Sequence, residues 1–286
     1  MWQIEQLQTS LCELHPFSGH ELSVVVVGSW GSQRPAFQIL VLVGGKAVKA
    51  ISLSQRHEWL TQVLELTRKI GLGLSWQDVR FILPSDLAPP SLAQGPSPIA
   101  LDRPIPDDLL MLVDGVAITN PELLKTARTL VIQHHATLTN ESNPDMPFLR
   151  LAHALQECWH RLCLHAAVHP DMERHQFGWR LVLQSLMIGL LHLKPAHTEE
   201  VLTFCEAPPL ERLSHLLKMP GFEATWAEDH QLFLDDFQTL MELRSIKPGS
   251  APVAMSQLTQ RRYNRFFYRL LTHANVDESL RYTLLS

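Results

Sequence analysis

Three apolar, β-branched runs follow one another between residues 22 and 53 and dominate the hydrophobic pattern of the chain. Residues 24–27 are four consecutive valines, and residues 37–43 are apolar but for one glutamine. Because a strand that is apolar at nearly every position has both faces covered, this pattern predicts strands that are buried on both faces. The pair Gly44-Gly45 suits a tight hairpin, and residues 46–53 alternate more loosely, as expected near a sheet edge. We therefore predict a buried three-stranded meander.

Segments with helical periodicity lie on both sides of these three runs. Residues 2–14 place apolar side chains at steps of three and four, which predicts an amphipathic helix. A second apolar stripe follows Ser54, which can cap the helix, and this stripe ends at Gly71. Residues 79–83, with the sequence VRFIL, predict a fourth strand. The expected order is α-βββ-α-β, a small mixed sheet with flanking helices, so the fold class is α+β.

The domain organisation follows from residue 84 onward. A proline-rich stretch at residues 84–106 excludes regular elements and predicts a long surface loop. Residues 116–118 predict a short strand that returns to the first sheet, and Pro121 suits the first position of the helix that follows. We place an α+β domain at residues 1–140 and a helical domain at residues 146–286.

Every segment of the predicted C-terminal domain has helical periodicity. A stripe of apolar residues runs from Phe148 to Ala166. Residues 172–193 are the most hydrophobic, with apolar side chains all round, as in the central helix of a bundle. Ser256 is expected to cap a long helix near the C-terminus. The other predicted helices are residues 198–205, 210–218, 227–243, 256–273 and 277–285. We therefore expect an all-α helical bundle.

Composition narrows the functional classes. The 286 residues include 24 Lys and Arg against 29 Asp and Glu, so no global basic field draws the chain to nucleic acid or to an anionic membrane. Four cysteines without C-x-x-C spacing favour buried thiols in a reducing compartment. The N-terminus lacks the basic region of a signal peptide, and the apolar residues 181–193 are too short to span a bilayer. We expect a soluble cytoplasmic protein without membrane contact.

The densest group of histidines is the candidate for a metal site. His153, Glu157 and His160 are spaced so that all three project from one face of a helix, which is typical of ligands. A dinuclear site in a bundle needs a second Glu-x-x-His on a facing helix, and Glu173 is followed by a histidine at the wrong spacing. We therefore expect hydrogen-bonded or surface histidines, and neither a metal nor another cofactor.

The beginning of the chain resembles the opening of the nucleotidyltransferase fold, in which a helix and a strand lead to a Gly-Ser turn and a second strand. Here the turn is Gly28-Ser29, and the resemblance covers residues 1–130. In that family the turn holds the nucleotide phosphates, and two aspartates on the next strand hold catalytic magnesium. Residues 36–41 contain no acidic residue. Because two-metal phosphoryl transfer requires carboxylate ligands, a nucleotidyltransferase-like fold in this chain would be catalytically inactive.

A basic stripe is predicted on the C-terminal helix. Arg261, Arg265 and Arg269 recur every four residues, and arginine beside aromatic rings is suited to a phosphate backbone or an unstacked base. The alternative is an amphipathic helix whose arginines meet water or pair with acids such as Asp235 and Asp236. The residues expected on the opposite side are Tyr263, Phe266, Phe267 and Leu270. The residues that we single out for contact with nucleic acid or a partner protein are Arg261, Arg262, Arg265 and Arg269.

No nucleophile, general base, metal cluster or phosphate loop stands out, so we assign no catalytic residue. The leading hypothesis is a non-catalytic cytoplasmic accessory or adaptor protein that binds a protein partner through its helical domain. One alternative is a nucleic-acid-associated protein that uses the basic and aromatic helix at residues 261–269. Another is a degenerate nucleotidyltransferase-like fold that still binds a nucleotide. The salt dependence of binding separates the nucleic-acid hypothesis from the others.

Overall fold

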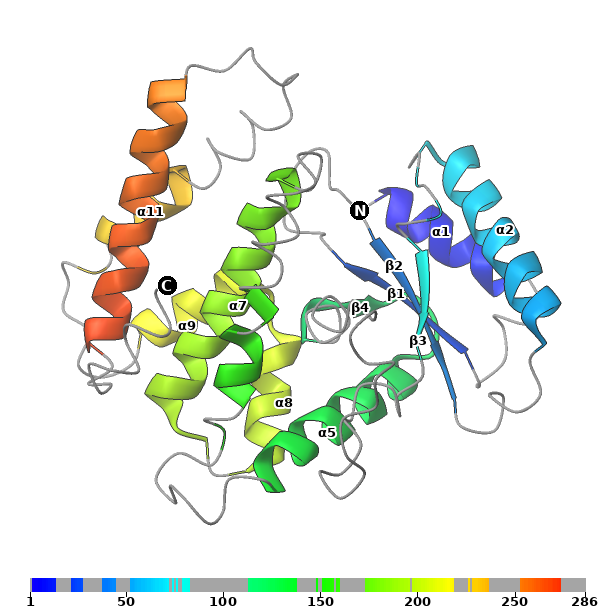
Figure 1. Cartoon of the computed structure of the whole chain (residues 1–286), viewed down its shortest axis with the longest axis horizontal. Coiled ribbons are helices and arrows are strands. Elements are labelled where there is room, and N and C mark those ends of the chain that lie inside the picture. Colours follow the sequence, from blue (N-terminus) through cyan, green and yellow to red (C-terminus); the bar gives the residue numbers. More distant parts are fainter. Residues whose placement is uncertain are drawn as a thin grey trace, which may run out of the picture. The chain divides into compact units, whose positions relative to one another are not determined.

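The computed structural model (Figure 1) describes the chain in separate segments. The described residues are 2–13, 22–27, 38–44, 52–71, 74, 76, 79–82, 113–137, 148, 151–156, 158–159, 173–195, 197–218, 226, 228–236 and 253–273. The chain divides into two compact units, one within residues 1–137 and one that contains residues 138–286. That residues 1–140 and 146–286 fold as independent domains stays a prediction.

The structure is mostly helical with one small sheet, which agrees with the predicted α+β class at this level. The first unit contains α1 (Trp2–Cys12), β1 (Leu22–Val27), β2 (Gln38–Val43), α2 (Leu53–Lys69), β3 (Val79–Ile82), β4 (Val116–Ala117) and α5 (Pro121–Thr137). The second unit contains α7 (Glu173–Leu193), α8 (Thr198–Glu206), α9 (Pro209–Leu217) and α11 (Val253–His273). Residues 151–156, 158–159 and 228–236 of this unit are also helical.

The sheet of the first unit has the strand order β3-β2-β1-β4. β1 runs antiparallel to both β2 and β4, whereas β2 and β3 are parallel. A parallel pair cannot be joined by a hairpin, and α2 is the helix that lies in the connection between β2 and β3. The sheet is therefore mixed, and both short strands β3 and β4 lie at its edges.

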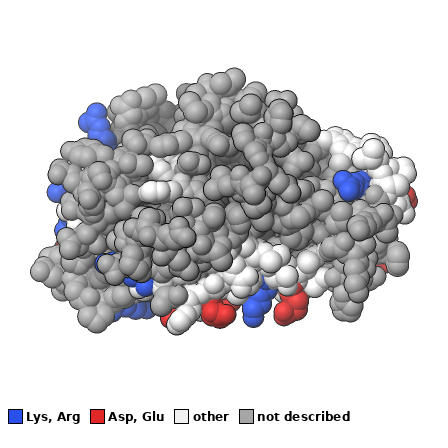
Figure 2. Space-filling model, turned by 60° about the horizontal axis from the view of Figure 1, so that its bottom comes forward, with Lys and Arg blue, Asp and Glu red and all other residues white. Residues whose placement is uncertain are grey.

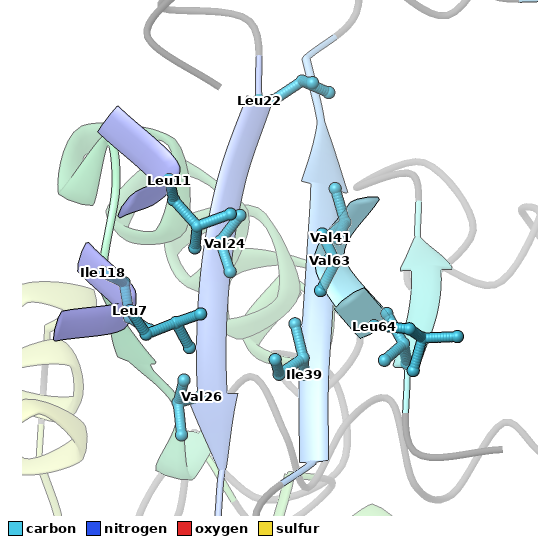
Figure 3. Packing of buried hydrophobic residues seen from close by; sticks show 11 residues of the cluster. Leu7, Leu11, Leu22, Val24, Val26, Ile39, Val41, Val63, Leu64 and Ile118 are labelled. Carbon is cyan, nitrogen blue, oxygen red and sulfur yellow. The ribbon is translucent and has the colours of Figure 1, made fainter. Parts of the chain in front are cut away.

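The continuous valine run of β1 is explained by burial on both faces. Val24 and Val26 belong to a core on one face of the sheet, together with Leu7 and Leu11 of α1 (Figure 3). Val25 points to the opposite face. All three valines are at most 1% exposed. The prediction that this strand is buried on both faces is confirmed.

Helices cover both faces. On the first face, Val63 and Leu64 of α2 join the core around Val24 and Val26. On the second face, α5 contributes Leu124 and other apolar residues that pack on Val25. The first unit is thus a layered arrangement in which α1 and α2 lie against one side of the sheet and α5 against the other (Figure 1).

Hydrogen bonds fix the start of α5 to the middle of the sheet. The backbone N–H of Val24 donates to the hydroxyl of Thr119 at 3.0 Å, and the hydroxyl of Ser23 donates to the Thr119 carbonyl at 2.7 Å. Ser23 is fully buried, so this bond satisfies a polar group inside an apolar layer. α5 then begins at Pro121, with an acidic residue in its first turn, as the sequence predicts.

Three predictions around α2 differ from the structure. Ser52, not Ser54, is the N-cap: its hydroxyl accepts a hydrogen bond from the backbone N–H of Gln55, and the Gln55 side chain accepts one from the backbone N–H of Ser52. The predicted third strand over residues 46–53 is therefore wrong at its end, because Ser52 caps α2 and Leu53 is its first residue. The predicted meander is also wrong, because the second neighbour of β2 in the sheet is β3 and not a strand at residues 46–53. Residues 46–51 lie outside the described part of the chain.

α7 is the central helix of the second unit. Every residue from Leu181 to Leu191 is buried, which fits the prediction of a helix that is apolar all round. α7 contacts α8, α9 and α11. The Nε2 atom of His192 donates to the backbone carbonyl of Leu270 at 3.0 Å and ties α7 to α11.

The remaining predictions agree with the structure, differ from it or lie outside the described residues. β3, β4 and the helices α8 and α9 lie within one or two residues of their predicted bounds. α11 begins at Val253 rather than at a cap formed by Ser256, so that prediction is wrong. The proline-rich residues 84–106 and the predicted helix at residues 277–285 lie outside the described residues. None of the helices in the described segments is long and apolar enough to cross a membrane.

Candidate functional site

The apolar side of α11 packs on the helical residues 228–236. Phe266 and Phe267 are at most 5% exposed. The ring of Phe266 stacks on that of Phe233 with 4.7 Å between centroids, and the ring of Phe267 meets Phe233 edge-on at 5.5 Å. Trp226 also contacts Phe266 edge-on. These aromatic residues therefore serve as an internal seam between two helices, and their faces are already occupied.

Two of the four arginines singled out on α11 form ion pairs across this seam, and one of them, Arg269, belongs to the basic stripe. Arg262 lies 3.4 Å from a carboxylate oxygen of Asp236. Arg269 pairs with Asp229, and its guanidinium also lies over the Trp226 ring at 4.8 Å from the centroid. The pairing of an arginine with Asp236 agrees with the alternative that the sequence left open. The cation–π contact adds to the ion pair and holds Arg269 against the protein surface.

A pocket of about 320 Å³ opens beside these ion pairs. Its described lining comprises Asp229, Leu232, Phe233, Asp236, Arg262, Arg265, Phe266 and Arg269. Arg265 is exposed and, among the described residues, forms no ion pair. The pocket therefore presents one cation that is not neutralised, next to two Arg–Asp pairs.

Exposed apolar side chains lie next to the pocket. Leu232, which lines it, is 52% exposed. Tyr268 is also 52% exposed and stands three residues after Arg265, which places the two on neighbouring positions of the helix surface. We call Tyr268 together with the residues that line the pocket the α11 surface. Arginine and tyrosine beside an apolar patch are characteristic of the centres of protein interfaces.

His230 lies behind the α11 surface. Its ring stacks on Phe266 with 6.3 Å between centroids, and its Nε2 atom is buried without a hydrogen-bond partner in the described structure. Desolvation by burial lowers the pKa of His230 below the ordinary value of 6.5, so the neutral ring is the favoured form at neutral pH. The histidine acts as an aromatic packing residue there.

Sequence reasoning found part of this site. All four predicted contact residues lie on α11, and three of them, Arg262, Arg265 and Arg269, come together in the pocket, whereas Arg261 is exposed outside its described lining. Asp229 and Trp226 were missed. The sequence does indicate a role for Asp229, because Asp229 and Asp236 are seven residues apart and so share a helix face.

The second pocket of the helical unit has a simpler explanation. It measures about 390 Å³ and is lined by apolar residues of α7, α8 and α9, with His215 and Lys218 at its edge. Both of these residues belong to the C-terminal end of α9, where basic side chains interact favourably with the helix dipole. Their position follows from the helix end itself and does not call for a ligand.

The other candidate sites are placed only in part. His153 is exposed, whereas Glu157 and His160 lie outside the described residues. Within the described segments, no group of three His, Cys, Asp or Glu residues is placed to hold a metal ion. The turn Gly28-Ser29 also lies outside them. β2, the strand that would carry the metal-binding aspartates of a nucleotidyltransferase, spans Gln38–Val43 and has no acidic residue.

On the face drawn in Figure 2, the described charges are mixed rather than separated. On the face drawn in Figure 2, the described Lys and Arg side chains lie in small separate groups, and along one edge a basic group lies between two acidic ones. This distribution fits a chain with a formal net charge of −5. On this face the described residues therefore provide no continuous basic track for a phosphate backbone.

Comparison of the chain with protein-family models, with curated proteins and with solved structures found no match.

Proposed function

We propose that the protein is a non-catalytic cytoplasmic accessory protein that binds a partner protein through the α11 surface of its helical unit. The observation that carries this proposal is the pairing of Arg262 with Asp236 and of Arg269 with Asp229. These pairs neutralise two of the four arginines singled out on α11, beside the exposed side chains of Leu232 and Tyr268. A surface of this kind offers apolar area and directional hydrogen bonds, the two features on which protein recognition depends.

The same pairing argues against phosphate as the main ligand. A phosphate group that approached Arg262 or Arg269 would meet the carboxylate that already pairs with the arginine, and the like charges would repel each other. The aromatic rings of Phe266 and Phe233 stack on each other, so they are not open platforms for bases. A protein partner with balanced charge meets neither obstacle.

Nucleic-acid binding is the second candidate, because one observation favours it. Arg261 and Arg265 are exposed and have no ion pair within the described residues, so two cations of the stripe remain available to phosphates. The nucleotidyltransferase-like alternative depends on Gly28-Ser29, which the described segments do not include, and no described contact supports it.

The proposal is tested by site-specific crosslinking of the full chain in its own cell. A photoreactive benzoylphenylalanine replaces Tyr268, and a matched control carries it at Leu130, which is 46% exposed on α5 of the first unit. We expect a discrete protein adduct from position 268 and not from position 130. We also expect the adduct to disappear when Leu232 is changed to serine in the chain that carries the crosslinker. Adducts to nucleic acid at position 268, or no adduct there, would contradict the proposal.

A further inference from the structure

The pocket of the α11 surface has an uneven charge balance. Among the described residues that line it, three arginines stand against two aspartates, and each aspartate is paired with one arginine. Arg265 is the cation that remains, and it forms no ion pair with any described residue. The described lining therefore carries one net positive charge in a chain whose formal net charge is −5. A single anionic group from outside would complete the pattern of pairs.

From this we infer that the partner presents a segment with one carboxylate, from Asp, Glu or a C-terminus, that pairs with Arg265, next to an apolar side chain that packs on Leu232. This inference rests on the proposed function, since it names the chemistry of the partner at the same surface. The planar guanidinium of arginine matches a carboxylate with two parallel hydrogen bonds, which makes this pair directional as well as attractive.

The lining selects a carboxylate over a phosphate. Asp229 and Asp236 lie in the same pocket as Arg265, so a doubly charged phosphate would face two negative groups and only one free cation. A carboxylate carries a single charge and leaves the existing pairs of Arg262 and Arg269 undisturbed. The charge count of the pocket therefore matches a monoanion.

The apolar part of the lining defines the neighbour of that carboxylate. Phe233 and Phe266 stack on each other in the wall of the pocket, and Leu232 leaves 52% of its surface exposed beside them. A volume of about 320 Å³ has room for one or two side chains and not for a folded element. Burial of an apolar side chain against Leu232 excludes water from the arginine–carboxylate pair, and this exclusion strengthens the pair.

The test uses the purified full chain and a displayed library of random 12-residue peptides at low and at physiological salt. We expect the enriched peptides to share an acidic residue, or a free C-terminal carboxylate, within two positions of a large apolar residue. Arg265→Ala should weaken their binding roughly ten- to hundredfold, the range for a hydrogen-bonded charge. Arg261→Ala is the matched control, because Arg261 is exposed on the same helix but is not among the described residues that line the pocket, and binding should stay within about twofold.

Arg265→Glu provides the sharper readout. Selection against this variant should enrich lysine or arginine in place of the acidic residue, because the sign of the free charge has changed. Enrichment of peptides that have neither an acidic residue nor a free C-terminal carboxylate near the apolar residue would overturn the inference, and so would peptides whose binding survives Arg265→Ala. In either case the proposed function stands if Leu232→Ser still abolishes their binding. If no peptide is enriched, or if enriched peptides bind independently of Leu232, both the inference and the proposed surface fail. A phosphopeptide that outcompetes its carboxylate counterpart would also overturn the inference.

Discussion

Arg212 donates a hydrogen bond from its Nε atom to the backbone carbonyl oxygen of Phe204 at 2.9 Å. Its Nη2 atom donates to the carbonyl of the next residue, Cys205, at 2.6 Å. Both carbonyls belong to the last turn of α8, where the helix has no backbone donor for them. Arg212 is only 1% exposed, so one buried guanidinium from α9 completes the end of α8.

We predict that Arg212→Lys destabilises the second unit by about 1–2 kcal/mol, and Arg212→Ala by about 3 kcal/mol or more. Lysine keeps the charge but has a single nitrogen, so it cannot reproduce the fork that reaches both carbonyls. Alanine removes both hydrogen bonds to buried carbonyls and creates a cavity. Urea unfolding monitored by circular dichroism measures the change. The exposed Arg261→Ala should change the free energy of unfolding by less than about 0.5 kcal/mol, and equal losses at the two positions would contradict the assignment.

Gly189 of α7 lies directly against the ring of Phe204 on α8. A methyl group built on Gly189 would overlap the ring of Phe204, which is a rigid side chain in a buried position. We predict that Gly189→Ala lowers the free energy of unfolding by about 1–2 kcal/mol, although alanine is the better helix former by roughly 1 kcal/mol. The double variant Gly189→Ala/Phe204→Leu should be more stable than the sum of the two single changes predicts, because leucine removes the overlapping ring atoms. Additive losses would show that the two residues do not constrain each other.

The valine strand offers a matched pair of substitutions. Val26 is 1% exposed and pairs across the sheet with Val116, which is 52% exposed at the edge strand β4. Val26→Asp places an unpaired carboxylate in the core and should destabilise the first unit by on the order of 3 kcal/mol or more. Val116→Asp should change stability by less than about 0.5 kcal/mol. Thermal melting monitored by circular dichroism compares them, and an unchanged melting temperature for Val26→Asp would contradict the burial of β1.

The parts of the fold that the sequence predicts well are those set by local pattern. Four consecutive valines indicate burial on both faces because side chains alternate along a strand, and the structure places Val25 opposite to Val24 and Val26. Pro121 marks the start of α5 because its missing N–H costs nothing at that position. The sequence did not decide between Ser52 and Ser54 as the N-cap of α2. The composition of the segment does not specify at which residue the backbone enters the helix.

The candidate site depends on how two helices dock, and this explains what the sequence could not provide. Arg262 and Asp236 are 26 residues apart, and Arg269 and Asp229 are 40 apart. Periodicity places the arginines on one side of α11, but it does not say which acids face them. For the same reason, aromatic residues next to arginines suggested stacking on bases, whereas Phe266 stacks on Phe233 within the protein.

His230 predicts how the stability of the second unit depends on pH. Burial lowers the pKa of His230 in the folded state below its ordinary value of 6.5, so the unfolded chain binds the proton more readily. The contribution of His230 to stability is therefore fully present above pH 6.5 and is lost as the pH falls through its folded-state pKa. His230→Phe keeps the stacking on Phe266 and removes the titration. We expect urea unfolding midpoints of this variant to fall less steeply than those of the wild type between pH 7.5 and 5.5, an interval of about one pH unit on either side of the ordinary value.

The control for this experiment is His230→Gln, which removes the titration by a different side chain. Both variants should show the same reduced dependence on pH, whatever their absolute stability. If the unfolding midpoints of both variants depend on pH as steeply as those of the wild type, His230 does not titrate in this interval. The packing role assigned to His230 would then need another explanation.

The last prediction concerns binding of nucleic acid by the α11 surface. Each phosphate contact releases a condensed counterion, so true binding weakens steeply with salt, and removal of three contacts flattens the dependence of log K on log salt by roughly two to three units. We expect no such binding in titrations of single- and double-stranded DNA and RNA, because Arg262 and Arg269 already pair with aspartates. The variants are the Arg261/Arg265/Arg269 triple alanine and the Arg261/Arg265 double alanine, which spares the contact of Arg269 with Asp229 and Trp226. One result would make nucleic-acid binding the better supported function. The wild type would bind with micromolar or tighter affinity, and the double variant would not bind although its circular dichroism spectrum is unchanged.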